Sequence, residues 1–161
     1  MTAREVGLTL DLSIIRLSVD LARHPELKSP IEGCFNCRLP DFGDLHGDTS
    51  TCLGLRTSRC DWLLLGSASG MADRAAAMKL QLAGAPAIIT DVSDSFVAVY
   101  NVDSVQLATH SAVLLRGEEA RPMQIGQVDV MAFCQKGLVT LLIPRSYRGA
   151  PCWQDLPRDS Q

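Results

Sequence analysis

Aromatic residues and lysine are both scarce in this 161-residue chain. Aromatic residues make up 5% of the sequence and hydrophobic residues 47%, which predicts a core built mainly from Val, Leu, Ile and Ala. Lysine occurs only at Lys28, Lys79 and Lys136, so arginine supplies the rest of the positive charge. The formal net charge is −3, and nucleic-acid-binding proteins usually have a basic excess instead. We therefore expect no nucleic-acid partner.

The chain also lacks a long apolar run and a recognisable secretory signal. A membrane helix needs about 20 consecutive apolar residues, and no segment reaches that length. Arg4 and Glu5 lie close to the N-terminus, and Asp11 interrupts the apolar run that follows, unlike the apolar region of a signal peptide. We expect no membrane partner and a cytoplasmic location, in which the six cysteines are thiols.

Strand-forming segments outnumber helical ones and come in adjacent pairs. One strand is expected at 10–19, and hairpins are expected at 51–66, 86–102 and 127–143. This order predicts an α+β fold of antiparallel sheets with packed helices, arranged as split βαβ-like lobes.

Helical spacing of apolar residues is clearest at 69–83. A second helix is expected at 105–115 and a last helical turn at 151–156, with Trp153 pointing inward. The polar segment at 40–50 is expected to be a loop, and the segment at 117–122 is expected to be charged and exposed.

The domain organisation follows from the length and the order of these elements. We expect a single domain over 1–156, built of two small lobes at about 1–85 and 86–156, and a frayed tail at 157–161.

Metal-binding chemistry is confined to one group of residues. Cys34 and Cys37 form a C-x-x-C pair, and together with His46 and Cys52 they could supply the four ligands of a tetrahedral zinc site. A second C-x-x-C pair and a tight histidine pair are both absent from the sequence. Two thiols that pack inward from a short helix explain the same pattern, so both interpretations stay open.

A catalytic constellation is not found in the sequence. The three histidines lie in no motif with a nucleophile or with paired carboxylates. The segment 66–70 (GSASG) precedes a helix but lacks the G-K-[S/T] ending of a phosphate-binding loop, so a helix cap explains it. We therefore expect neither a catalytic nor a cofactor-binding residue on this chain.

Interface chemistry is expected at four residues. Arg145 and Tyr147 follow Pro144 at a strand end, and arginine and tyrosine are residue types that anchor interfaces. Alternatively, Arg145 pairs with a local carboxylate and Tyr147 closes the edge of the core. Trp62 and Trp153 are the two tryptophans of the chain, and we expect them at the interface as well.

Three segments resemble the gamma subunits of heterotetrameric sarcosine oxidases. They are 60–66 (CDWLLLG), 89–95 (ITDVSDS) and 142–147 (LIPRSY), and the last precedes a tryptophan, here Trp153, that the family has in a terminal helix. The resemblance extends from about residue 60 onward. It is loose at 10–19, and residues 152, 154 and 155 are more polar than their counterparts in the family.

This resemblance implies a fold similar to a truncated folate-binding aminomethyltransferase domain. It implies alpha and beta subunits that carry FAD, FMN, NAD and the tetrahydrofolate site, and a small delta subunit that holds zinc. Such complexes oxidise sarcosine or a related N-alkyl amino acid and pass the one-carbon unit to tetrahydrofolate. The gamma subunit has no part in this chemistry and stabilises or docks the larger subunits.

Two alternatives belong to other functional classes. The first is a free-standing folate-binding protein similar to the aminomethyltransferases, although those enzymes need roughly twice this length to build their folate channel. The second is a small zinc-binding adaptor, which depends on the group formed by Cys34, Cys37, His46 and Cys52.

Overall fold

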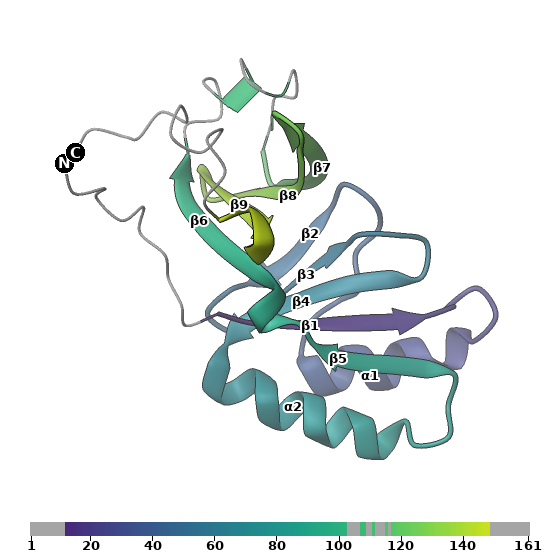
Figure 1. The fold of residues 1–161 in the computed structure, drawn as a ribbon. Helices are drawn as coiled ribbons and strands as arrows, with labels where there is room; N and C mark the ends of the chain where they lie inside the picture. The colour runs from purple at the N-terminus through teal and green to yellow at the C-terminus, as the bar shows by residue number, and fades with distance from the viewer. Residues whose placement is uncertain (1–11, 103–106, 109–110, 112–114, 116, 149–161) are drawn as a thin grey trace. The chain divides into compact units, whose positions relative to one another are not determined.

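The chain forms two compact units in the computed structural model, which describes residues 12–102, 107–108, 111, 115 and 117–148 (Figure 1). The N-terminal lobe comprises described residues 12–93, and the C-terminal lobe comprises those from 94 to 148. The boundary lies eight residues beyond the expected position, after 93 and not after 85. The strand that begins at Ala87 belongs to the N-terminal sheet, and this pairing moves the boundary.

An antiparallel five-stranded sheet is the framework of the N-terminal lobe, with the strand order β2-β3-β4-β1-β5. Its strands are β1 (Leu12–Val19), β2 (Leu45–Asp48), β3 (Cys52–Arg56), β4 (Asp61–Ser67) and β5 (Ala87–Asp91). The expected hairpin at 51–66 is present as β3 and β4. The expected loop at 40–50 is wrong in part, since it contains β2. That strand is short, polar and at the sheet edge, where alternation of apolar residues is not required.

Two helices, α1 (Lys28–Phe35) and α2 (Ala68–Gln81), lie side by side on one face of this sheet, and a short 3-10 turn (Pro25–Leu27) leads into α1 (Figure 1). Alternate residues of β1 face the helices. The core between the layers includes Ile15, Leu17, Ile31, Phe35, Met71 and Met78. The predicted helix at 69–83 is confirmed, although it begins one residue earlier, with Ser67 as its N-cap.

The C-terminal lobe has a four-stranded antiparallel sheet with the order β6-β9-β8-β7. Its strands are β6 (Phe96–Val102), β7 (Glu119–Ile125), β8 (Val128–Gln135) and β9 (Leu138–Pro144). The predicted hairpin of β8 and β9 is confirmed, and its turn has positive φ angles of 51° at Lys136 and 80° at Gly137. Two 3-10 turns, Ser93–Ser95 and Arg145–Tyr147, flank β6 and β9.

Two expectations for this half of the chain are corrected by the pairing. The segments at 86–102 do not form a hairpin, because β5 pairs with β1 and β6 pairs with β9 in separate sheets. The segment at 117–122 is not exposed throughout, because β7 begins at Glu119 and Ala120 is buried. Its charged residues and Pro122 are tolerated because β7 is an edge strand in which Arg121 and Pro122 are exposed.

Other expectations fall on the undescribed part of the chain. Of the helix expected at 105–115, only Leu107, Ala108 and Ser111 are described as helical. The turn at 151–156 with Trp153 and the tail at 157–161 lie outside the described residues. In the described part, no helix combines the length and the apolar character needed to cross a membrane.

We expect Gly66→Ala to destabilise the N-terminal lobe. An added Cβ would lie 2.8 Å from the backbone oxygen of Thr51 and 2.9 Å from Met71 Cγ, so the packing has to shift at a cost of about 1–3 kcal/mol. Gly33→Ala in α1 is the control, because nothing lies within 4 Å of its Cβ position, and it should stabilise by about 0.5–1 kcal/mol. Urea unfolding measures both changes; equal effects would contradict the close packing at Gly66.

Candidate functional site

The four candidate zinc ligands do not come together in the structure. Cys34 Sγ donates a hydrogen bond to the backbone oxygen of Arg74 (3.3 Å). Cys37 Sγ is hydrogen-bonded to Cys52 and lies 3.4 Å from the backbone oxygen of His46. The structure thus pairs two of the four side chains, Cys37 and Cys52. Among the residues that it describes, no group of three or more His, Cys, Asp or Glu side chains could hold a metal ion.

Of the paired thiols, Cys52 also has chemistry that disfavours metal binding. Cys37 and Cys52 both lie in the apolar core beneath the helices, 5% and 0% exposed. The hydrogen bond to Cys37 raises the pKa of Cys52, and burial raises it further. Because a zinc ligand has to be a thiolate, the raised pKa makes Cys52 a poor ligand, although the same hydrogen bond lowers the pKa of Cys37. In the structure, Cys37 and Cys52 pack into the core as a pair of thiols.

A cluster of side chains lies at the end of β3, where Arg56 contacts two aromatic rings. The Arg56 guanidinium carbon is 4.7 Å from the centroid of the Phe42 ring and 4.9 Å from that of the Trp62 ring. Trp62 is 2% exposed and donates from Nε1 to the backbone oxygen of Pro40 at 3.0 Å, while Phe42 is 57% exposed. The cation therefore joins a core tryptophan to a surface phenylalanine.

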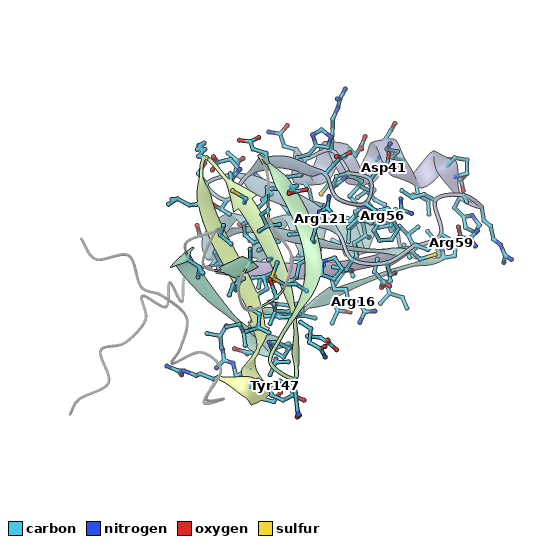
Figure 2. All side chains as sticks on the ribbon, turned by 90° about the horizontal axis from the view of Figure 1, so that it is seen from above. Arg16, Asp41, Arg56, Arg59, Arg121 and Tyr147 are labelled. Atoms are coloured by element: carbon cyan, nitrogen blue, oxygen red, sulfur yellow. The ribbon has the colours of Figure 1, made fainter. Side chains whose placement is uncertain are left out.

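The Arg56 guanidinium also donates hydrogen bonds to two loops and so connects them. Nε donates to the backbone oxygen of Ser58 (3.0 Å), Nη2 to that of Arg59 (2.5 Å), and Nη1 to Asp41 Oδ1 (3.2 Å). Figure 2 shows Asp41, Arg56 and Arg59 close together at the surface. We call Asp41, Phe42, Arg56 and Trp62 the Arg56 corner. The planar fork holds the loop before β2 against the β3–β4 turn and leaves the Phe42 ring exposed to solvent.

The Arg56 corner changes the role expected for Trp62. The Trp62 indole lies in the core of its own lobe and is not exposed to a partner, whereas the neighbouring Phe42 ring is exposed. Phe42 is not among the interface residues expected from the sequence. A signal was present, since a phenylalanine in a loop rich in Asp and Gly has no role in forming the turn.

Asp61, at the start of β4, accepts hydrogen bonds from three neighbouring side chains. Arg16 donates from Nε and Nη2 at 3.2 and 3.1 Å, Ser58 Oγ donates at 2.5 Å, and Ser18 Oγ donates as well. Burial raises the pKa of Asp61, but the hydrogen bonds from Ser18, Ser58 and Arg16 outweigh it and hold the pKa below its ordinary value. The carboxylate therefore has a structural role in joining β1 to the β3–β4 turn.

The expected interface residues Arg145 and Tyr147 lie in the 3-10 turn that follows β9. Arg145 Nη2 is 3.7 Å from Asp94 Oδ1, so the expected pairing with a local carboxylate is present. Both partners are well exposed to solvent, and such a pair contributes little to stability. Tyr147 is 46% exposed and lies at the surface of the C-terminal lobe (Figure 2). Trp153, the fourth expected interface residue, lies outside the described residues.

Comparison with known proteins supports a relation of fold. No protein-family model matches the sequence, and no curated protein sequence matches it. A solved structure does match: a chain of the heterotetrameric sarcosine oxidase from Corynebacterium sp. U-96, in complex with pyrrole 2-carboxylate. The TM-score is 0.74 at 14% sequence identity, over 84% of this chain and 73% of that chain. The two chains are similar in fold.

This similarity agrees with the fold class expected from the sequence. The α+β architecture with two antiparallel sheets and two helices is similar to that of the oxidase chain. An identity of 14% relates the folds and leaves membership of the family as a prediction. The likeness to a folate-binding aminomethyltransferase domain also stays a prediction.

We expect Arg56→Lys to lower the free energy of unfolding by about 1–2 kcal/mol. Lysine keeps the charge but loses the flat group that stacks on both rings and the fork that reaches three oxygen atoms. Arg59→Lys is the matched control, since the Arg59 side chain is exposed and should be replaceable within about 0.5 kcal/mol. Chemical denaturation of both variants tests this, and an equal effect would show that the stacked geometry contributes nothing.

We expect the stabilisation that Asp61 provides to depend on pH. The pKa of Asp61 is lowered in the folded chain, so its contribution is present above the unfolded value of about 3.9 and is lost as the pH falls through the folded value. The difference in unfolding free energy between the wild type and Asp61→Asn should therefore be largest near neutral pH and shrink in acid. Urea unfolding over that range measures it; a difference that stays constant would contradict the hydrogen-bond network.

Proposed function

We propose that this chain is the gamma subunit of a heterotetrameric oxidase of the sarcosine oxidase type. In this role it stabilises or docks the larger subunits and has no active site of its own. The observation that carries the proposal is the similarity in fold to a chain of such an oxidase, which extends over 84% of this chain. The segments at 60–66, 89–95 and 142–147 support the gamma position by their resemblance to that family.

The interactions of the reactive side chains support a docking role. Asp61 accepts hydrogen bonds from its neighbours in β1 and the β3–β4 turn. Cys37 and Cys52 are hydrogen-bonded to each other in the core. Meanwhile two aromatic side chains, Phe42 and Tyr147, are well exposed at sites where an arginine lies nearby. Exposed aromatic and arginine side chains are the residues that most often anchor protein interfaces.

The rest of the complex follows from the same proposal. The partners are alpha, beta and delta subunits in the cytoplasm. FAD, FMN, NAD and tetrahydrofolate bind to the larger subunits, zinc binds to the delta subunit, and no cofactor binds to this chain. The complex oxidises sarcosine or a related N-alkyl amino acid.

Purification of the tagged full-length chain from the cells that produce it tests this proposal. We expect larger chains to co-elute with flavin absorbance and with oxidation that depends on sarcosine or another N-alkyl amino acid. Elution of the chain alone, without flavin, would contradict the proposal. Tetrahydrofolate binding by the isolated chain would favour the aminomethyltransferase-like alternative, and stoichiometric zinc in the isolated chain would favour the adaptor.

Arg145→Ala should weaken assembly by about tenfold or more while it leaves the melting temperature of the isolated chain almost unchanged. The physical reason is that an exposed ion pair adds little to folding, whereas an arginine buried by a partner adds much to binding. Asp94→Ala is the matched control, because it removes the same ion pair and keeps Arg145. Titration of the flavin-bearing subunits with each variant measures the affinity; equal losses would assign Arg145 to the local pair alone.

A further inference from the structure

Among the described residues the two sheets have four edge strands, and β5 differs from the other three. Natural proteins protect exposed sheet edges with charges, proline, bulges or short strands. β7 contains Pro122 and the ion pair of Arg121 with Glu119 (3.0 Å). β2 has four residues and a φ of 92° at Gly47, and β6 has a register shift between Val99 and Val102. β5 pairs regularly with β1 and is uncharged from Ala87 to Thr90.

Backbone hydrogen bonds near both ends of β1 show which groups of β5 face outward. The Val92 N–H donates to Ile14 O (2.9 Å) on the β5 side of β1, and the Val19 N–H donates to Cys60 O (2.8 Å) on the β4 side. Hydrogen-bonded pairs alternate along an antiparallel ladder. Even-numbered residues of β1 are therefore bonded to β5, and odd-numbered residues to β4.

The same alternation continues along β5. Thr90 and Ile88 lie opposite the even-numbered Arg16 and Ser18 and are bonded to β1. Ile89 and Asp91 consequently direct their backbone N–H and C=O groups away from the sheet. The described residues provide no backbone partner for these groups. The edge thus offers two donors and two acceptors in strand geometry.

The side chains along this edge are compatible with an added strand. Ile88 is 66% exposed, and Thr90 is also exposed on the same face of the sheet. An isoleucine with this exposure leaves apolar surface in contact with water, and covering that surface with another side chain is favourable. Asp91 is exposed, and hydrogen bonds from Ser93 lower its pKa, so the end of the edge carries a negative charge at neutral pH.

We propose that an extended segment of a larger subunit adds to β5 as a sixth strand of the N-terminal sheet. This inference rests on the proposed function. The added strand bonds to the outward backbone groups of Ile89 and Asp91, places an apolar side chain over Ile88, and has a basic or neutral residue near Asp91. Main-chain hydrogen bonds supply the affinity, and these two side-chain positions supply the specificity.

A second copy of this chain fits the edge less well. Antiparallel self-pairing centred on Ile89 would bring Ala87 opposite Asp91 as the next hydrogen-bonded pair. The Ala87 N–H already donates to Ala85 O at 2.8 Å, so each flanking pair would lose one of its two bonds. A different strand can be placed in a register that uses Ile89 and Asp91 without requiring the Ala87 N–H.

Hydrogen exchange of the full chain, alone and in the flavin-bearing complex, tests the proposal. In the isolated chain the amides of Ile89 and Asp91 should exchange quickly, because no backbone group of the described residues accepts their protons. In the complex, exchange of both should slow by about tenfold or more, whereas the amide of Leu138, an exposed residue of the C-terminal lobe, should not change.

Two lysine substitutions provide a matched pair for affinity. Ile88→Lys places a charge on the edge and should weaken association with the flavin-bearing subunits by about tenfold, with the melting temperature of the isolated chain retained. Leu138→Lys is the control, because Leu138 is 51% exposed and lies in β9 of the other sheet, and it should bind within about twofold of the wild type.

The outcomes separate this inference from the proposed function. A complex that forms while Ile89 and Asp91 exchange as fast as in the free chain overturns strand addition and leaves the proposed function standing. Protection of both amides in the isolated chain at high concentration identifies a second copy as the occupant and overturns the proposal. Failure to find any flavin-bearing complex overturns both, because the edge then has no such partner.

Discussion

The hydrogen-bonded ladder on both sides of β1 is the constraint on which the N-terminal lobe depends. β1 is bonded to β4 along one side and to β5 along the other, and its alternate side chains form the centre of the core beneath the helices. The segment between β4 and β5 includes α2, which covers the sheet face that this core fills. Among the described strands β5 pairs with β1 alone, so a contact between distant parts of the chain places the last strand of the sheet.

The Arg56 corner shows how the core of this lobe shapes its surface. Trp62 is fixed in the core by packing and by its hydrogen bond to Pro40, and Arg56 stacks on it from β3. The guanidinium then binds loop oxygen atoms and the Phe42 ring, so the position of an exposed aromatic group is set by a buried one. An aromatic side chain held by such a contact loses less conformational entropy when a partner covers it than a free one does, which suits the proposed docking role.

Much of the fold could be predicted from local patterns. The helix at 69–83 and the hairpin of β8 and β9 depend on residue spacing and on a glycine in the turn, and the structure has both. Patterns failed where pairing partners are distant in sequence. The segments at 86–102 have the alternation of a hairpin, but a strand's alternation does not specify which strand it pairs with. Edge strands were missed because polar residues are tolerated there, as in β2 and β7.

For the candidate site, the sequence by itself determined the residue chemistry: few aromatic residues, arginine in place of lysine, and no motif for catalysis. It could not place Trp62 in the core, separate Cys34 from the pair of Cys37 and Cys52, or single out Phe42 and the edge of β5. Tertiary structure alone decided those, because the exposure of a side chain or backbone group depends on which distant segments pack against it. Neighbours along the chain carry no such information.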